Sequence, residues 1–529
     1  MRIDKNTTIR LGDRNIIKIK IGDSVIWEKK TGPEIDYFYI ESLGDGNAVS
    51  VVNEGNGSTD NVTPTLEYST DKNTWNTITF NWASGTHTTK LPILNTGEKM
   101  YFRNDTRLFS RTYNKYISFS PSVSSNVGGD IRTLSNYLDV DSETKTQTGM
   151  FYNLFRNNIK IVDASNLRLS YTTLEQGCYS CLFQGCTSLT TPPTLPATTL
   201  ASYCYYYMFN GCTSLTTPPT LPATELADSC YYDMFSGCTS LQTAPSLPAT
   251  TLASDCYYNM FSGCTKLTSA PTLPATTLAD RCYQNMFSGC TSLTSAPTLP
   301  ATELAYNCYI RMFQGCTSLT TAPVLPATAL SQDCYNSMFN GCTSLTSAPE
   351  LPSTNLAYNC YSRMFQGCTS LTSAPVLPAT TLVNGCYSRM FEGCTSLTSA
   401  PELLATTLVS NCYDYMFNGC TSLTSAPELP ATTLVNGCYS RMFQGCTSLT
   451  TAPVLPATTL VDYCYYYMFY DCTSLNEVTV YAEDISATDC TNDWLSGVAS
   501  TGTFRNLGSA TYPTNSPSGI PSGWTEVKS

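Results

Sequence analysis

The sequence has one histidine and few charged residues, and these two shortages exclude several functions at the outset. Charged residues make up 13% of the 529-residue chain, about half of the usual share. Thr, Ser, Asn and Tyr must therefore cover much of the surface. The net charge is −12, and an acidic surface repels nucleic acid and anionic membranes because phosphate binding needs Lys and Arg. We expect no nucleic-acid partner.

Long apolar runs are also missing. No run approaches the roughly 20 residues that a membrane helix needs, so we expect no membrane insertion. Residues 1–30 contain no apolar segment that ends in small residues, which is the pattern of a secretory signal. We therefore expect the chain to fold in a reducing compartment, where thiols do not pair.

The shortage of histidine argues against catalysis. General acid–base catalysis most often uses this residue, and His87 lies in a Gly-Thr-His-Thr segment that we interpret as an exposed loop. No arrangement of a Ser or Cys nucleophile accompanies it. We predict that the protein is not an enzyme and that it uses no cofactor or metal.

Cysteine, in contrast, is abundant and regularly spaced. Apart from Cys181, the 26 cysteines fall into two columns with a spacing of 26 residues. The first column runs from Cys178 to Cys490, and the second runs eight residues later, from Cys186 to Cys472. Twelve full periods span residues 178–489. A unit of this length is too short to bury its own apolar side chains, so it must stack on its neighbours.

The constant apolar positions are therefore the predicted interior of a repeat solenoid. Coils joined by a parallel sheet stand about 4.8 Å apart, which gives twelve coils a length of roughly 60 Å. Each interior side chain would pack on its equivalents in the neighbouring coils, and the columns would form ladders. In one unit the predicted ladder residues are Cys282, Met286, Phe287, Cys290, Leu293, Leu299 and Leu304.

Within a unit, the residue types predict short parallel strands and short helical or turn returns. The strand is expected over Leu293–Pro297, and the return, with one or two helical turns, over Leu304–Phe313. Gly289 is expected to take a positive φ at the end of that return. Each unit carries two prolines, such as Pro297 and Pro300, which cannot donate to a ladder, so the strands must be short.

The cysteine columns also raise the question of disulfides and metals. Cysteines of one column would have Cα atoms about 4.8 Å apart, inside the range for a disulfide. Residues stacked in register have parallel Cβ vectors, however, and a whole column would have no consistent pairing. Cys282 and Cys290 are not in a C-x2-C zinc spacing. We predict a buried, reduced cysteine ladder in which cysteine packs as a small apolar residue.

The segment from Met286 to Leu293 reads Met-Phe-x-Gly-Cys-Thr-Ser-Leu and occurs in twelve units, in three of them with one change. It resembles the Ala-Phe-x-x-Cys-x-x-Leu core of leucine-rich repeats of the BspA type, found in bacterial surface proteins and in phages of gut bacteria. The resemblance covers about residues 150–490. It departs from the family in its period, 26 rather than the more usual 23 or so, and in its two prolines.

The flanking residues predict further parts. Residues 1–30 alternate apolar and charged residues around a turn at Gly22-Asp23, which indicates an N-terminal β attachment element, and residues 31–34 read as a linker. Residues 35–147 predict an all-β sandwich domain before the solenoid, with strand-like runs at Thr65–Tyr68, Thr77–Trp82 and Lys99–Arg103. The leucine-rich-repeat-like solenoid of 26-residue units would span residues 148–489. Residues 490–529 would form a C-terminal cap over its open end.

The segment from Ile17 to Trp27 resembles short N-terminal segments of phage tail proteins. Together with the repeats and the Gly519–Trp524 tail, it resembles large proteins encoded by phages of gut Bacteroidetes. That resemblance implies a virion-associated tail fibre or receptor-binding protein, made in the host cytoplasm and held to other virion proteins through its N-terminal region. A bacterial cell-surface adhesin of the BspA kind and a purely structural virion fibre or decoration protein are the alternatives. Whether the chain forms a homo-oligomer is left open.

Candidate binding residues are the ones that vary between repeats. The two residues after each constant Tyr change from unit to unit, as do the two before each first Cys, for example Asp280-Arg281 and Tyr306-Asn307. Positions that accept Tyr, Arg, Asp and Ser must face solvent, and Tyr and Arg are enriched at recognition surfaces. The predicted partner is a host surface glycan or a protein receptor; neutral drift on a solvated face is the other interpretation. The candidate face comprises Tyr206, Tyr207, Tyr232, Asp233, Tyr258, Gln284, Arg311, Arg363, Arg389, Tyr415, Arg441, Tyr466 and Tyr467.

One further column contains carboxylates. Glu350, Glu402 and Glu428 share a repeat position, and glycosidase carboxylates lie about 5–10 Å apart, a spacing that adjacent coils could supply. No insertion interrupts the repeats to form a pocket, so we interpret these residues as part of a solvated face.

Overall fold

The computed structural model describes residues 35–55, 65–80, 85–105, 116–138, 140 and 144–528, together with the backbone of four short strands between residues 10 and 28. Among these strands β1 (Arg10–Leu11) pairs with β2 (Arg14–Asn15), and β3 (Lys18–Ile21) pairs with β4 (Ser24–Glu28). The N-terminal segment therefore contains β structure. The turn expected at Gly22-Asp23 and the linker expected at residues 31–34 lie outside the described residues.

A β domain precedes the repeats and is built from two sheets. One has the strand order β13-β12-β5-β10-β7-β8 and the other β11-β6-β9. The first sheet comprises β5 (Phe38–Ser42), β7 (Thr65–Ser69), β8 (Asn76–Thr79), β10 (Lys99–Arg103), β12 (Ser125–Asp130) and β13 (Ile161–Arg168). The second comprises β6 (Asn47–Gly55), β9 (Gly85–Leu94) and β11 (Tyr116–Ser120).

Aromatic side chains hold the two sheets together. The ring of Phe119 on β11 lies 5.3 Å from that of Phe38 on β5 and 4.7 Å from that of Phe102 on β10. All three side chains are buried, because alternate residues of each strand point to the same face. The prediction of an exposed loop around His87 is wrong. His87 lies in β9, half-buried and paired in register with Asn53 of β6, because the strand continues through the Gly-Thr-His-Thr segment.

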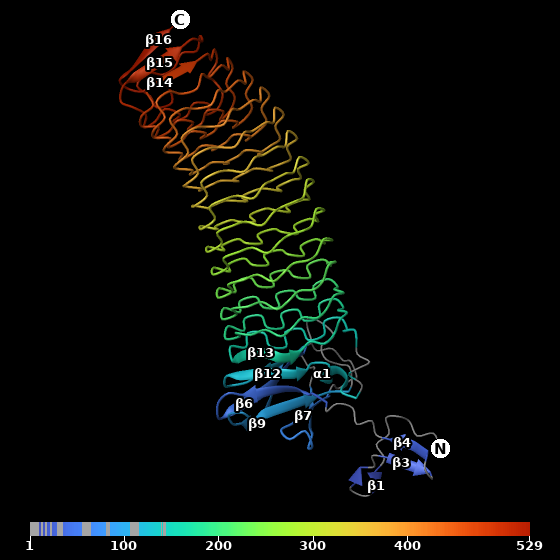
Figure 1. Cartoon of the computed structure of the whole chain (residues 1–529). Coiled ribbons are helices and arrows are strands. Elements are labelled where there is room, and N and C mark those ends of the chain that lie inside the picture. The colour runs from blue at the N-terminus through green and yellow to red at the C-terminus, as the bar shows by residue number, and fades with distance from the viewer. Residues whose placement is uncertain are drawn as a thin grey trace.

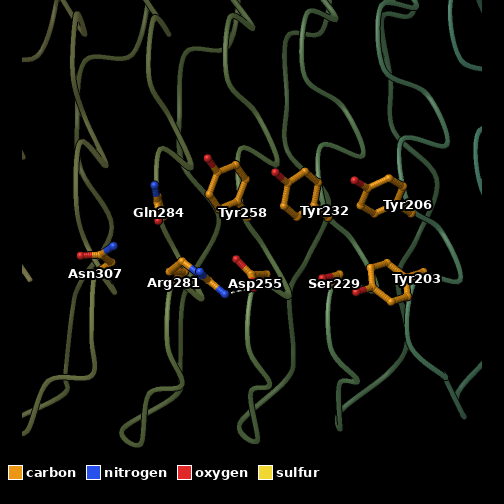
Figure 2. A pocket seen from close by; sticks show the side chains of 9 residues that line it. All are labelled: Tyr203, Tyr206, Ser229, Tyr232, Asp255, Tyr258, Arg281, Gln284 and Asn307. Carbon is orange, nitrogen blue, oxygen red and sulfur yellow. Dashed lines mark hydrogen bonds and ion pairs between the residues drawn. The ribbon is translucent and has the colours of Figure 1, made fainter.

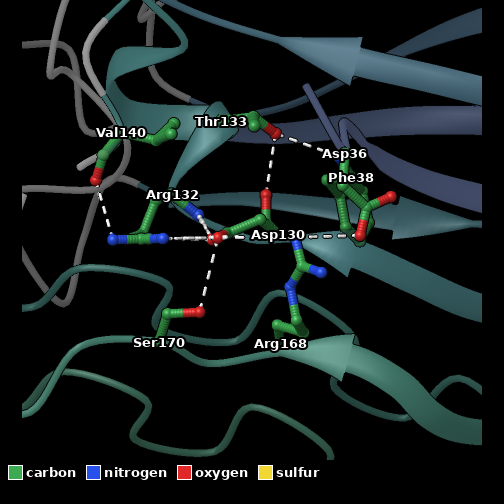
Figure 3. A network of polar contacts seen from close by, with 8 residues as sticks. All are labelled: Asp36, Phe38, Asp130, Arg132, Thr133, Val140, Arg168 and Ser170. Carbon is green, nitrogen blue, oxygen red and sulfur yellow. Dashed lines mark hydrogen bonds and ion pairs between the residues drawn. The ribbon is translucent and has the colours of Figure 1, made fainter. Parts of the chain in front are cut away.

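A polar network joins the β domain to the first coil (Figure 3). Asp130, at the end of β12, forms an ion pair of 2.8 Å with Arg132 and lies 3.8 Å from Arg168 at the end of β13. Thr133, in the helix α1 (Thr133–Asn136), accepts a 2.9 Å hydrogen bond from the N–H of Phe38 and donates one to the carbonyl of Asp130. β13 also pairs with β12 in parallel, with two register shifts, so the edge strand of the sheet lies against the first coil of the repeats.

The repeats form an elongated, gently curved stack of coils that rises from the β domain (Figure 1). Aromatic ladders run through its interior. The Phe287 ring lies 5.6 Å from that of Phe261 in the previous coil and 5.7 Å from that of Phe313 in the next, and the constant Tyr283 stacks similarly on its neighbours. Of the expected ladder residues, Cys282, Met286, Phe287, Cys290, Leu293 and Leu299 are buried. Leu304 is only half-buried and packs against the edge of the core.

The prediction of one or two helical turns in the return, Leu304–Phe313, is wrong. Residues 144–528, all of which the structure describes, contain no helix. In the segment 281–289 alternate N–H groups donate to the next coil, as Tyr283 N–H does to Cys308 O and Phe287 N–H to Met312 O, instead of to the carbonyl four residues back. The positions of Arg281, Asn285 and Gly289 have φ values of 54°, 54° and 73°. A positive φ at every fourth residue prevents a right-handed helix.

The segment 281–289 and its equivalents in the other coils together form a strip along the stack, which we call the turn strip. Its linking N–H groups all point toward the following coil, and the carbonyls that accept them all point toward the preceding one, as in the bonds from Asn259 to Gln284 and from Asn285 to Ile310. The positive φ of Gly289 was expected, whereas those of the other two columns were not.

The expected parallel strand is reduced to single bridges. Ser295 bridges Ser269 in the previous coil and Thr321 in the next, both in parallel. Between Arg168 and Glu477, a stretch that the structure describes throughout, no strand extends beyond such bridges. The two prolines of each unit explain this shortening, because neither can donate to a ladder.

All 26 cysteines are buried free thiols. The thiols of the second column have a defined partner: Cys290 Sγ donates to the carbonyl of Phe261 in the previous coil at 3.1 Å. The thiols of both columns lie in an apolar interior that disfavours the thiolate, and burial raises the pKa of Cys282 to about 12. The cysteine ladder predicted from the 26-residue spacing is confirmed.

The stack ends at a small parallel sheet of order β14-β15-β16, formed by β14 (Glu477–Val480), β15 (Gly502–Asn506) and β16 (Trp524–Lys528). Trp494 stands at the position of the constant Met, one period after Met468; it is fully buried and stacks on Tyr465 of the last regular coil at 6.1 Å. The N–H of Leu495 donates to Pro517 O at 3.1 Å. The residues expected to cover the end of the stack therefore contact it.

Candidate functional site

The variable residues lie on one face of the stack because the turn strip directs them there. The constant Tyr231 points inward and is buried, while the next residue, Tyr232, is only half-buried. The residue after that has a positive φ in every coil, as Tyr207 and Arg311 do. This local conformation repeats with each unit, so equivalent side chains form straight rows along the stack.

In the N-terminal half of the stack two such rows border a groove, which we call the tyrosine groove (Figure 2). The rings of Tyr206, Tyr232 and Tyr258 stack on one another, with centroid distances of 4.9 and 4.4 Å. Gln284 continues this row in the next coil. The second row is offset by three residues, and its Tyr203 contacts Tyr206 edge-on at 5.6 Å. The groove has a volume of about 450 Å³ and is lined by Tyr203, Tyr206, Ser229, Tyr232, Asp255, Tyr258, Arg281, Gln284 and Asn307.

One ion pair crosses from coil to coil in the second row. Arg281 Nη2 lies 2.8 Å from Asp255 Oδ2, and the two side chains are 44% and 16% exposed. These are the two charged residues of the lining, so the groove carries no formal net charge. The hydrogen bond to Asp255 raises the pKa of Arg281 above its ordinary value.

Asp233 does not belong to the exposed surface, contrary to the expectation that its position faces solvent. It is 4% exposed and accepts a 3.3 Å hydrogen bond from Asn259 Nδ2 in the next coil. Burial raises the pKa of the Asp233 carboxyl, against the opposing effect of its hydrogen bonds. The rings of Tyr207 and Tyr232 lie 5.7 Å apart in the same two coils, and the Tyr207 hydroxyl donates a hydrogen bond to the Asp233 carboxyl.

The C-terminal half of the same face has a different composition. Arg389 lies over the ring of Tyr415 at 3.9 Å from its centre, and Arg441 lies 5.0 Å from the centre of the same ring. Arg441 also contacts the rings of Tyr466 and Tyr467 at 4.8 and 5.3 Å. We call this cluster the arginine–tyrosine row. Cation–π contacts of this type hold both partners in place.

The structure therefore divides the predicted face into two clusters and leaves three residues outside them, the buried Asp233 among them. Tyr206, Tyr232, Tyr258 and Gln284 line the tyrosine groove, Tyr207 contacts Tyr206 without lining the groove, and the later five residues form the arginine–tyrosine row. Arg311 and Arg363 are exposed and lie between the clusters.

The second row of the groove was missing from the predicted set. Its members precede the first cysteine of each unit, and their variation was visible in the sequence. Their shared backbone conformation was not: Tyr203, Ser229, Asp255, Arg281 and Asn307 all have a positive φ, between 53° and 61°. An excess of Asn, Asp and Gly in this column, which includes Gly385 and Gly437, was the available signal.

The glutamates that share a repeat position lie elsewhere on the surface. Glu350, Glu402 and Glu428 are exposed, in a column where Val324 and Val376 are also 79% and 76% exposed. Within the described part of the chain, no group of three His, Cys, Asp or Glu side chains is placed to hold a metal ion. The same residues include no helix with the length and apolar character needed to cross a membrane.

The fold and the face together define a repeat protein whose coils stack in register and display varied side chains on a constant framework. The model of the BspA type leucine rich repeat region matches residues 152–294, 198–338, 283–401, 364–489 and 404–511, which together make up more than half of the chain. The chain belongs to this family. No individual curated protein matches it significantly.

Proposed function

We propose that this chain is an adhesion protein, whose stack presents a rigid, non-catalytic surface to a receptor on a host cell. The observation that carries the proposal is the gathering of tyrosine and arginine on one face of a framework that otherwise hardly varies. Drift alone would scatter residue types, whereas these side chains form two ordered clusters with ring and cation–π contacts. Both residue types are enriched where proteins recognise partners.

We propose a phage virion as the carrier of this surface, with the N-terminal strands β1–β4 and the β domain joined to other virion proteins and the stack directed outward. Support for the carrier comes from the resemblance of residues 17–27 to phage tail segments. The alternative carrier is a bacterial cell surface, which the family match fits equally well. A structural fibre or decoration protein without a receptor is the third alternative.

Binding to whole cells tests the adhesion function directly. We expect the fluorescently labelled full chain to bind some strains in a panel of cultured gut Bacteroidetes saturably. Replacing Arg389 and Arg441 by alanine, or Tyr232 and Tyr258 by phenylalanine, should weaken binding through at least one cluster. The control is Glu350→Gln, on the separate glutamate column. Absence of saturable binding to every strain would contradict the proposal.

Adsorption of virions separates the carriers and the structural alternative. If the chain is a receptor-binding fibre, virions that lack it should adsorb to their host much more slowly, and the free chain should compete with intact virions. Unchanged adsorption of virions that lack the chain would favour the structural alternative. Detection of the chain on bacterial cells free of phage would favour the adhesin.

A further inference from the structure

We infer that the tyrosine groove binds a neutral, hydroxyl-rich oligosaccharide that lies along the axis of the stack. This inference rests on the proposed adhesion function and names the ligand class of one of its two clusters. Its basis is the set of polar groups that the two rows direct into the groove, together with the ligand classes that the groove cannot accommodate.

The lining offers many hydrogen-bonding groups to sugar hydroxyls. Tyrosine hydroxyls both donate and accept, amides do the same with separate atoms, and a carboxylate accepts. Four phenols, one carboxylate and two amides are arranged in two parallel rows. Among the described residues, Gln284 Oε1 and Asn307 Oδ1 have no hydrogen-bond partner. A buried acceptor without a partner is costly, and a turn of either amide toward the groove would allow a ligand hydroxyl to satisfy it.

The stacking of the tyrosines determines how a sugar would be held. Both faces of the Tyr232 ring are covered, by Tyr206 on one side and Tyr258 on the other. The row therefore presents ring edges and hydroxyls rather than open faces. Recognition would depend on hydrogen bonds to hydroxyls more than on contact between a sugar ring and an aromatic plane.

An anionic ligand does not fit this groove. Its one cation, Arg281, is already paired with Asp255 at 2.8 Å. A negatively charged sugar would have to break that ion pair and would also approach a chain of net charge −12. Like charges in close contact oppose binding.

An extended peptide does not fit either. Peptides that add a strand need free backbone N–H and C=O groups at an edge. The backbone groups of the lining are engaged within and between coils: Tyr232 N–H donates to Ser229 O, and Tyr232 O accepts from Tyr207 N–H. Equivalent bonds occupy those of Tyr258 and Gln284.

The repetition of the groove favours a chain of sugars over a single one. Each coil contributes one residue to each row, so similar groups recur along the axis at every coil. A linear oligosaccharide brings equivalent hydroxyls to successive coils, and each additional unit adds contacts of the same kind. Affinity should therefore rise with ligand length until the groove is filled.

Calorimetry with the full chain tests the ligand class. The probes are neutral hexasaccharides of glucose, mannose and galactose, and a galacturonic acid hexamer as the anionic comparison. We expect at least one neutral hexasaccharide to bind, its disaccharide to bind more weakly, and the anionic hexamer not to bind. The double variant Tyr232→Phe with Tyr258→Phe keeps the ring stack but removes two hydroxyls, and should weaken binding by about tenfold or more.

The matched control is Tyr358→Phe with Tyr481→Phe, which removes two exposed hydroxyls outside both clusters and should leave oligosaccharide binding unchanged. Circular dichroism of both double variants checks that the stack is intact. Binding of the anionic hexamer alone, binding of none of the probes, or equal binding by wild type and the Tyr232/Tyr258 variant would overturn the inference. If cells are still bound in that case, the adhesion function stands with a different ligand; if cells are not bound either, both proposals fail.

Discussion

The β domain and the repeat stack meet at strand β13, yet they are stabilised in opposite ways. The core of the β domain brings together residues far apart in sequence, such as Phe38 and Phe119. The stack repeats the same few contacts between neighbouring coils, as in the Phe261–Phe287–Phe313 ladder. We expect the β domain to unfold as a unit and the stack to fail coil by coil.

The largest expected difference between the regions comes from alkaline pH. Burial raises the pKa of Cys282 to about 12, and other thiols of the stack shift in the same direction, whereas residues 35–147 contain no cysteine. The unfolded chain loses these protons near pH 8.5 and the folded stack keeps them. Stability is therefore full below about pH 8.5 and falls as the pH rises toward 12, by about 1.4 kcal/mol per pH unit for each thiol.

Hydrogen exchange at pH 8 and pH 10.5, corrected for the intrinsic rate and run in 0.5 M salt to screen general repulsion, measures this difference. We expect protection to be lost in residues 178–489 while β5, β10 and β12 retain theirs. Equal loss in both regions would show that buried thiols are not the cause.

The next largest difference is expected when a buried phenylalanine of each region is replaced by alanine. Phe287→Ala removes a fully buried ring and should cost about 3–5 kcal/mol. Because each coil contacts only its neighbours, exchange should increase around residues 261–313 and leave the β domain unchanged. Phe102→Ala, in contrast, should expose the whole β domain. Thr298→Ala, at an exposed position, is the control. A global loss of protection from Phe287→Ala would contradict the neighbour-only account.

A smaller difference in stability between the two regions is expected when a glycine of similar φ in each is replaced by alanine. Gly289 has a φ of 73° and a Cβ added there would lie 3.7 Å from Gly263, at ordinary contact distance, so Gly289→Ala should cost about 1 kcal/mol from backbone strain alone. At Gly129, with a φ of 81°, the added Cβ would lie 2.1 Å from the carbonyl oxygen of Tyr37. Gly129→Ala should therefore cost about 3 kcal/mol or more. Denaturant unfolding of both variants checks the order, and equal costs would contradict it.

The smallest predicted effect has the opposite sign. The Tyr283 hydroxyl is buried and has no hydrogen-bond partner among the described residues, and burial raises its pKa well above the ordinary value. Tyr283→Phe keeps the ring ladder and removes the unpaired group, so it should leave the stack as stable as before or more stable by up to about 1 kcal/mol. Thermal unfolding measures the change. A loss of more than 1 kcal/mol would show that the hydroxyl has a partner.

The stack interior was predictable because a fixed spacing of 26 residues forces identical side chains into register. Cys282, Met286 and Phe287 follow from that argument alone. The turn strip was only partly predictable: the column of Arg281 and Gly385 has an excess of Asn, Asp and Gly, but the column of Tyr207, which also has positive φ, holds mostly Arg and Tyr. A non-glycine residue in that conformation is uncommon, so residue type gave little warning there.

The candidate site was predicted in part for a related reason. Variation identified the outer rows, but tyrosine occurs both inside, as Tyr257, and outside, as Tyr258. Only the three-dimensional arrangement shows that Asp233 is covered and that Asp255 and Arg281 face the same groove as Tyr258. Which side chains of the two rows meet depends on how adjacent coils are offset from each other. The sequence of a single repeat unit does not give that offset.

The turn strip also gives the molecule an electrical direction. Its linking peptide groups are aligned head to tail, and each carries a dipole of about 3.5 D, so one end of the strip is partially negative and the other partially positive. The β domain covers the negative end, where Phe119 N–H donates to Leu154 O at 2.9 Å. At the positive end Asp489 and Asp493 occupy positions that hold Tyr463 and Tyr467 one coil earlier. An added coil can therefore join the stack in one orientation only. In a reversed coil, carbonyl groups would face the carbonyl groups of a neighbouring coil and no linking hydrogen bonds could form.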